Sequence, residues 1–253
     1  MKVINFLINN WDVIILGIIA SILTIFLQTV VKIISNVLTY FLTLRWNLRR
    51  LFSFVDKEDI YVISGSIDKY AKKEIALLMG PDASAAANLY RTLGDIYPDS
   101  KIKHIYSTTQ QSIYIDENIV SVGGPVYNIC TKNLMKLLRP IVFFDENDAL
   151  NYKGEIYSKS EERDEDYGLI IRMVNPFATT RKALVIAGCG SHGVLAASML
   201  FNKTGKFKNI RKDFKKKFGF SNHLLNKDFI AIIRCRIIGN DVTDVVFIDV
   251  TNI

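Results

Sequence analysis

The sequence predicts an α/β protein in which one N-terminal transmembrane helix is followed by a mostly parallel sheet domain that ends in a β-hairpin. Three observations support this fold class. Residues 13–44 form a nearly unbroken apolar run, strand and helix patterns alternate from residue 56 onward, and the last two strand patterns meet at Gly239-Asn240. We therefore divide the chain into a transmembrane and juxtamembrane helix, residues 1–55, and one soluble domain, residues 56–253.

The apolar run is long enough for one membrane crossing. At about 1.5 Å per residue, residues 13–31 cover a hydrocarbon core of roughly 30 Å, and too few residues remain for a second span. Lys2 is the only Lys or Arg before the span, whereas Lys32 and an arginine cluster at residues 45–50 follow it. The positive-inside rule therefore predicts a single-pass protein of the inner (plasma) membrane whose C-terminal domain is cytoplasmic.

Polar side chains recur along this run at steps of three and four residues, so they share one face of a helix. A polar face on a membrane helix needs partner helices or a water-filled cavity. We therefore expect a homo-oligomer in which this face lines a pore. The expected pore-lining residues are Ser21, Thr24, Gln28, Lys32 and Ser35.

The soluble part alternates strand and helix patterns in an order that favours βαβ units and a largely parallel sheet. In chain order we expect a strand at 60–64, a helix at 82–96, strands at 102–107 and 119–122, a helix at 128–138 and a strand at 141–144. Further strands are expected at 169–174, 184–187, 229–238 and 242–250, with a helix at 194–201. No internal repeat or low-complexity linker interrupts this part, which favours a single soluble domain.

Cysteine and histidine are too sparse for a disulfide framework or a zinc site. The three cysteines, Cys130, Cys189 and Cys235, are widely spaced and form no CxxC pair, which fits a reducing compartment. The three histidines match no metal-ligand spacing. We therefore expect no metal site and no cofactor.

Positive charge is concentrated in one short segment. Eight Lys and Arg side chains crowd residues 203–217, and an acidic stretch at 161–166 precedes them. One interpretation is that Lys212, Lys215 and Lys216 contact anionic lipid or the phosphates of a nucleotide or oligonucleotide. The alternative is a solvated helix face, with the interleaved phenylalanines packed on the core.

Two glycine-rich turns each follow a strand and precede a helix. GGPVYN covers residues 123–128, and GCGSHG covers residues 188–193. At such a junction glycines let the backbone approach a ligand, and free N–H groups of the helix attract an anion. The second turn matches G-x-G-x-x-G, but no acidic residue follows at the end of a next strand, so we interpret it as a phosphate or polar-ligand turn and not a nicotinamide site. An ordinary tight turn is the alternative for both.

These turns, the end of the first strand and the basic segment together predict a ligand site. Its expected residues are Ser64, Gly65, Gly123, Gly124, Pro125, Asn128, Asn175, Gly188, Gly190, Ser191, His192, Gly193, Lys212, Lys215 and Lys216. No catalytic residue is assigned, because no paired carboxylates sit in the glycine-rich turns and no nucleophile has an evident base.

Three ordered motifs resemble a prokaryotic Rossmann-like domain family that carries GGPxxN and AGxGxxG turns. They are NIVSVGGPVYN at 118–128, DYGLIIRMVNPF at 166–177 and ALVIAGCGSHGVLAA at 183–197. The resemblance implies a Rossmann-like fold that binds a small molecule or nucleotide. With one membrane helix joined to such a domain, the chain also resembles bacterial anti-phage membrane effectors, among them the transmembrane effector of the Hailong system. That resemblance implies a cytosolic domain that senses a nucleotide signal and helices that form a pore.

The sequence therefore predicts an oligomeric membrane effector, an ion channel or pore gated by a nucleotide or oligonucleotide on its cytosolic domain. The implied partners are membrane lipid, further copies of the chain and a nucleotidyltransferase that makes the ligand. One alternative is a membrane-tethered enzyme that processes nucleotides or nucleosides, with Asn128, Asn175 and His192 around the glycosidic bond. Another is an anchored scaffold whose glycines are only structural.

Overall fold

The computed structural model describes residues 11–66, 79–107, 116–202, 208–218 and 227–253. The chain divides into two compact units, Met1–Asn47 and Leu48–Ile253, which are considered separately below. Lys2, which the prediction of orientation used, lies outside the described residues, as does the first part of the basic segment, residues 203–207.

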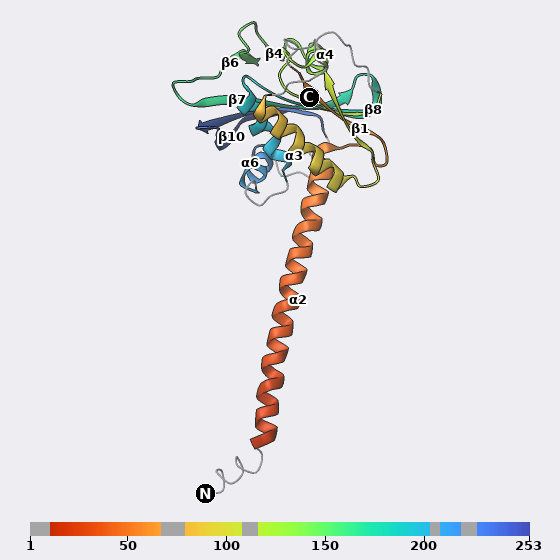
Figure 1. The fold of residues 1–253 in the computed structure, drawn as a ribbon, viewed down its shortest axis with the longest axis vertical. Coiled ribbons are helices and arrows are strands. Elements are labelled where there is room, and N and C mark those ends of the chain that lie inside the picture. The colour runs from red at the N-terminus through yellow and green to blue at the C-terminus, as the bar shows by residue number, and fades with distance from the viewer. Residues whose placement is uncertain (1–10, 67–78, 108–115, 203–207, 219–226) are drawn as a thin grey trace. The chain divides into compact units, whose positions relative to one another are not determined.

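Most of helix α2 (Trp11–Phe52) belongs to the first unit (Figure 1). It is one continuous helix of 42 residues, and many large apolar side chains between Ile15 and Leu38 are exposed in the single chain. All five residues of the predicted polar stripe are exposed as well. Of the helices in the described part of the chain, none has the combined length and apolarity that a membrane crossing requires.

The second unit is built on a sheet of seven strands. Their spatial order is β10 (Asp241–Asn252), β9 (Phe229–Ile238), β7 (Glu165–Asn175), β8 (Ala178–Gly188), β3 (Asn118–Val122), β1 (Ile60–Gly65) and β2 (Ile102–Ser107). Parallel pairings join β2, β1, β3 and β8, and β9 runs in the same direction because both it and β8 are antiparallel to β7. Five of the seven strands therefore share one direction, as the α/β prediction requires. The predicted C-terminal hairpin is confirmed as β9 and β10, with Gly239 in a left-handed conformation at the turn.

Two features of the strand pairing were not predicted. The strand expected at 141–144 does not enter the main sheet: β4 (Val142–Phe144) pairs with β5 (Leu150–Tyr152), which pairs with β6 (Glu155–Tyr157), in a small antiparallel sheet. Only Val142 of β4 is fully buried, whereas a central parallel strand is covered on both faces. The chain also reverses after Asn175, so β7 and β8 form an antiparallel hairpin and not two parallel strands.

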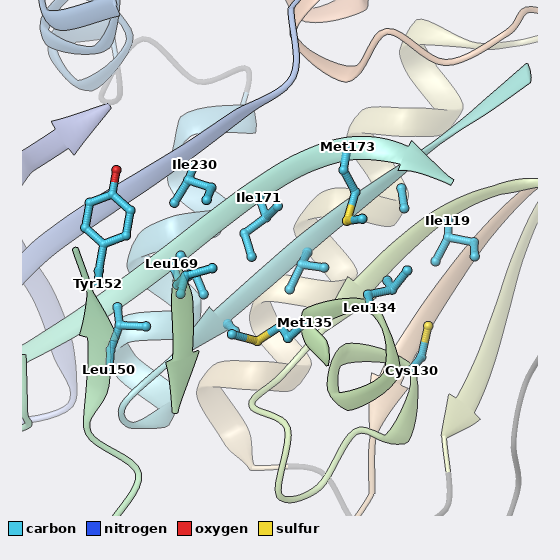
Figure 2. Packing of buried hydrophobic residues seen from close by; sticks show 14 of the residues in the cluster. Ile119, Cys130, Leu134, Met135, Leu150, Tyr152, Leu169, Ile171, Met173 and Ile230 are labelled. Atoms are coloured by element: carbon cyan, nitrogen blue, oxygen red, sulfur yellow. The ribbon is translucent and has the colours of Figure 1, made fainter. Parts of the chain in front are cut away.

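Helices and the small sheet cover the two faces of the main sheet. One face carries α3 (Gly80–Ile96), α5 (Ser191–Ser198), the 3₁₀ turn η2 (Met199–Phe201) and α6 (Lys208–Phe218), and the other carries α4 (Ile129–Lys136) with the small sheet (Figure 1). Figure 2 shows the core on the α4 side, where Leu134 and Met135 meet strand residues such as Leu169 and Ile171. Alternate residues of the same strands are buried against α3 and α5, as a period of two dictates.

A buried arginine joins the end of α2 to this sheet. Arg172, in the middle of β7, is fully buried and donates from Nη1 to the carbonyl oxygens of Arg50 (2.7 Å) and Leu51 (2.8 Å). Its Nε lies 3.8 Å from a carboxylate oxygen of Asp228, and its guanidinium stacks on the ring of Phe229. Burial lowers its pKa to about 10, so the side chain stays charged at neutral pH. The last turn of α2 is therefore part of the core of the second unit.

Replacing Arg172 with Met should destabilise the second unit by about 3–5 kcal/mol, because it leaves the buried carbonyls of Arg50 and Leu51 without their donor and removes one of the two cations beside Asp228, the other being Lys182. Urea denaturation of the detergent-solubilised full chain, followed by circular dichroism, measures this loss. The control is Arg234→Met, whose half-exposed ion pair with Glu165 at 3.6 Å should contribute less than about 1 kcal/mol. Equal losses in the two variants would contradict the role given to Arg172.

Candidate functional site at the carboxyl edge of the sheet

The structure brings the two glycine-rich turns together with the end of β1. The Ser66 N–H donates to the Tyr127 carbonyl (3.0 Å), and the Gly123 N–H donates to the Ile186 carbonyl (2.9 Å). The chain after β1 continues to α3 on one face of the sheet, and the chain after β3 continues to α4 on the other. In open α/β sheets such a divergence between neighbouring strands opens the crevice in which ligands bind. The carboxyl edge between β1 and β3 is therefore the candidate site.

The first turn is held by Asn128. Its side chain accepts from the N–H groups of Cys130 (3.0 Å) and Thr131 (3.2 Å) and donates to the carbonyls of Ile63 (3.1 Å) and Val122 (2.9 Å). Asn128 is fully buried, and these four bonds use both its donors and its acceptor. Asn128 thus caps α4 and ties β1 to β3, and a ligand contact by its side chain would require one of these bonds to break.

Glycines in and beside the first turn are set by close backbone packing. Gly123 has φ +110°, a conformation that L side chains rarely adopt. A Cβ atom at Gly65 would lie 2.9 Å from the Tyr127 carbonyl oxygen, so the first strand can meet the turn only through a glycine. Pro125 is half-buried and Val126 is exposed, which leaves the outer side of the turn accessible.

The second turn binds a carboxylate of the protein itself. Asp166, at the start of β7, is fully buried and accepts from the N–H groups of Gly190 (2.9 Å), Gly193 (2.7 Å) and Tyr167 (2.8 Å). The Gly190 and Gly193 N–H groups are donors that we expected to hold a phosphate, and in the structure a carboxylate of the protein occupies them. A carboxylate already satisfies the N-terminus of α5 and would repel a second anion.

The glycines of this second turn serve the same contact. A Cβ atom at Gly190 would lie 2.7 Å from Asp166 Oδ2, and one at Gly193 would collide with the Tyr167 carbonyl. The G-x-G-x-x-G spacing therefore reflects the close approach of α5 to β7. Ser191 and His192, in the first turn of α5, are half-buried.

A second carboxylate lies at the same edge. Asp82 is in the first turn of α3 and lies beside Gly123: a Cβ atom added to Gly123 would be 3.6 Å from Asp82 Oδ2. Burial, with a smaller contribution from the negative charge of Asp166, raises the pKa of Asp82 to about 7. Its Oδ1 is buried without a hydrogen-bond partner among the described residues. This pair was not predicted from the sequence, because Asp82 and Asp166 lie outside the glycine-rich turns and converge only through the fold.

Ser64 is fully buried at the end of β1 and shares a hydrogen bond of 2.9 Å with His104 Nε2 on the neighbouring strand β2. Burial lowers the pKa of His104. Ser64 therefore points toward β2, and its hydroxyl is engaged within the protein.

Four of the predicted ligand residues are not brought to this edge. Asn175 donates to the Glu117 carbonyl (2.6 Å) just before β3, which places it at the opposite end of the sheet. Lys212, Lys215 and Lys216 lie on α6, which packs on β10 through Phe214 and its ring contacts with Phe229 and Phe247. β10 and β3 are separated by four strand spacings, or roughly 19 Å. A single small ligand at the first glycine-rich turn therefore does not reach these lysines.

The cysteines have the properties of structural residues. Cys130, Cys189 and Cys235 are free thiols, and burial raises the pKa of Cys130 to about 11 and those of the other two to about 12. Thiols with raised pKa values are poor nucleophiles at neutral pH. In the part of the chain that the structure describes, no group of three or more His, Cys, Asp or Glu side chains could hold a metal ion.

No protein-family model matches the chain, and no curated protein matches it. Its function must therefore be inferred from the residues and their geometry.

The raised pKa of Asp82 predicts a specific pH dependence of stability. The folded protein keeps this proton up to about pH 7, whereas the unfolded chain releases it near the ordinary value of 3.8, so stability falls as pH rises between these values. At about 1.4 kcal/mol per pH unit, the loss at pH 8 is at most about 4 kcal/mol. Asp82→Asn should therefore stabilise the protein at pH 8 and flatten this part of the profile.

Thermal unfolding of the full chain between about pH 4 and pH 8 measures the effect. Asp99→Asn, in the exposed loop after α3, makes the same chemical change and should keep the wild-type profile. A parallel profile for Asp82→Asn and wild type would show that Asp82 titrates as it does in the unfolded chain.

Proposed function

We propose that the chain is an oligomeric membrane effector, an ion channel or pore of bacterial anti-phage defence, gated by a nucleotide or oligonucleotide bound to its Rossmann-like cytosolic domain. The observation that carries this proposal is the continuity of α2 (Figure 1). One helix carries the apolar run and ends in Leu48, Leu51 and Phe52, which are buried in the second unit. In this proposal, a rearrangement of that unit is transmitted to the helix through these buried residues.

The apolar segment of α2 supports the membrane part of the proposal. Side chains such as Leu16, Phe26 and Ile34 are each at least 60% exposed in the single chain. A contiguous apolar surface of this kind requires a cover of lipid or of partner helices. The polar stripe on the same helix favours several copies around an axis, where its side chains would face water or one another.

Strand β7 supports the gating part of the proposal. Asp166 binds the glycine-rich turn at one end of β7, and Arg172 binds the end of α2 six residues later on the same face, about 20 Å away. A ligand at the carboxyl edge that moves α5 relative to β7 would therefore also act on the contact between β7 and the end of α2. Such a ligand can shift an equilibrium between two arrangements only by binding one of them more tightly.

The polar stripe can be tested in cells. Replacing Thr24 and Gln28 together with Leu should preserve membrane insertion and abolish depolarisation, because the double variant removes polar groups from the predicted pore lining. The matched control replaces Ile22 and Phe26 with Leu on the opposite side of the helix and should keep depolarisation. A voltage-sensitive dye in cells with equal expression, after the defence response is triggered, gives the readout. Unchanged depolarisation in the stripe variant would remove the pore from the proposal.

A membrane-tethered enzyme that processes nucleotides or nucleosides is the second candidate. Its support is the pair of carboxylates at the carboxyl edge: Asp82 carries a proton near neutral pH, and Asp166 lies close enough to influence that proton. A carboxyl group with a pKa near the working pH is suited to general acid or base catalysis.

Turnover distinguishes the two candidates. If the chain is an enzyme, the purified full chain should convert a nucleotide from a mixed panel to products that chromatography and mass spectrometry resolve, and Asp82→Asn should slow this conversion about 100-fold or more. Intact nucleotide recovered from the wild-type protein would instead favour the effector.

A further inference from the structure

A hollow beside the first glycine-rich turn is unused by the site described so far. It lies between α4 with its following loop and the hairpin of β4 and β5, and Pro125 and Val126 of the turn form part of its rim. Its volume is about 740 Å³. Small-molecule sites typically measure about 300–1,000 Å³, so the hollow could hold a nucleotide.

One wall of the hollow is positively charged. Lys132 and Lys136 lie one turn apart on the same side of α4, and Arg139 follows in the loop. The Arg139 guanidinium stacks on the Phe143 ring, with 4.9 Å between its central carbon and the ring centroid, and this contact leaves its N–H groups available. Among the described residues, none of these three cations forms an ion pair.

The opposite wall is acidic and rigid. It contains Asp145, Glu146 and Asp148. Asp145 Oδ1 accepts from the N–H groups of Asn147 (2.9 Å) and Ala149 (3.0 Å), which fixes the turn between β4 and β5. Burial and the neighbouring Asp145 raise the pKa of Asp148, as expected for a carboxyl group without a cation beside it.

The cationic and acidic residues line the same hollow without pairing. No ion pair within 4.0 Å links Lys132, Lys136 or Arg139 to the acidic turn in the described structure, although flexible side chains of opposite charge line the same space. The cationic wall suits a phosphate. The acidic wall suits hydrogen-bond donors such as ribose hydroxyls or an exocyclic amine.

We infer that this hollow binds the nucleotide, with its phosphates on Lys132, Lys136 and Arg139 and its donor-bearing end toward the acidic turn. The inference rests on the proposed function, in that the domain must bind a nucleotide. This site differs from the two phosphate positions that the sequence predicted. Asp166 already occupies the N–H groups of the second glycine-rich turn, and α6 packs on a distant strand. Asn128 and Asp145 hold the two walls in place without a ligand, so little ordering is needed on binding.

Binding of ATP and of inorganic pyrophosphate to the full chain tests the inference, by titration calorimetry in nanodiscs of phosphatidylcholine. The double variant Lys132→Glu with Lys136→Glu should weaken ATP binding at least 100-fold and should abolish competition by pyrophosphate. The matched control is Lys212→Glu with Lys216→Glu, which makes the same charge change at the same spacing on α6 and should alter the affinity less than about twofold. Circular dichroism checks that all three proteins are folded.

The acidic wall has its own test. Glu146→Gln with Asp148→Asn should strengthen pyrophosphate binding, because like charges are removed, and should weaken ATP binding, because acceptors for its hydroxyl or amino groups are lost. Asn tolerates the left-handed conformation of Asp148, with φ +59°. Parallel changes for both ligands would overturn the proposed orientation.

The outcomes separate this inference from the proposed function. ATP binding that survives reversal of Lys132 and Lys136 overturns the inference and leaves nucleotide gating intact. No ATP or pyrophosphate binding by the wild-type protein overturns the inference and removes gating by a mononucleotide from the proposed function. Loss of ATP binding when phosphatidylserine is added to the nanodiscs would show that the hollow takes a lipid phosphate, and it would overturn the inference.

Discussion

The fold of the second unit depends on two buried charges that β7 presents to helix ends. Arg172 donates to the carbonyls at the C-terminus of α2, and Asp166 accepts from the N–H groups at the N-terminus of α5. Each charge has the sign that complements the dipole of the helix it meets, and each satisfies backbone groups that have no partner within the helix. Because both lie on one strand and one face, they fix the last turn of α2 and the start of α5 to the same side of the sheet.

This arrangement explains how a glycine-rich turn can match a nucleotide fingerprint while its N–H groups bind a carboxylate of the same chain. In a dinucleotide site the N–H groups of the turn and the helix dipole are free to attract the ligand. Here Asp166 supplies the negative charge from within the chain, and Gly190 and Gly193 provide the space for it. The same glycine spacing therefore serves a different anion, and only the tertiary structure distinguishes the two cases.

The sequence predicted most elements whose pattern is local. The helix at α3 and the final hairpin were expected because apolar periodicity and a Gly-Asn turn are encoded in neighbouring residues. The small sheet and the reversal between β7 and β8 were missed although the paired strands are neighbours in the chain, because an apolar strand pattern does not indicate which sheet a strand joins or in which direction it runs. Asp166 precedes Gly190 by 24 residues, so its contact follows only from packing. One signal was available: Arg172 interrupts an otherwise apolar strand and thereby marks a buried charge.

Asp82 differs from these two charges because nothing among the described residues balances it. Its position in the first turn of α3 is favourable for a carboxylate, yet burial beside Asp166 raises its pKa to about 7. Asp82 lowers the stability of the fold at neutral pH, and its Oδ1 lacks a hydrogen bond among the described residues. These properties are typical of a residue in a functional site and not of one that stabilises the fold. Two carboxylates at this edge disfavour phosphate there, whereas the cations of α4 favour it on the other side of Pro125 and Val126.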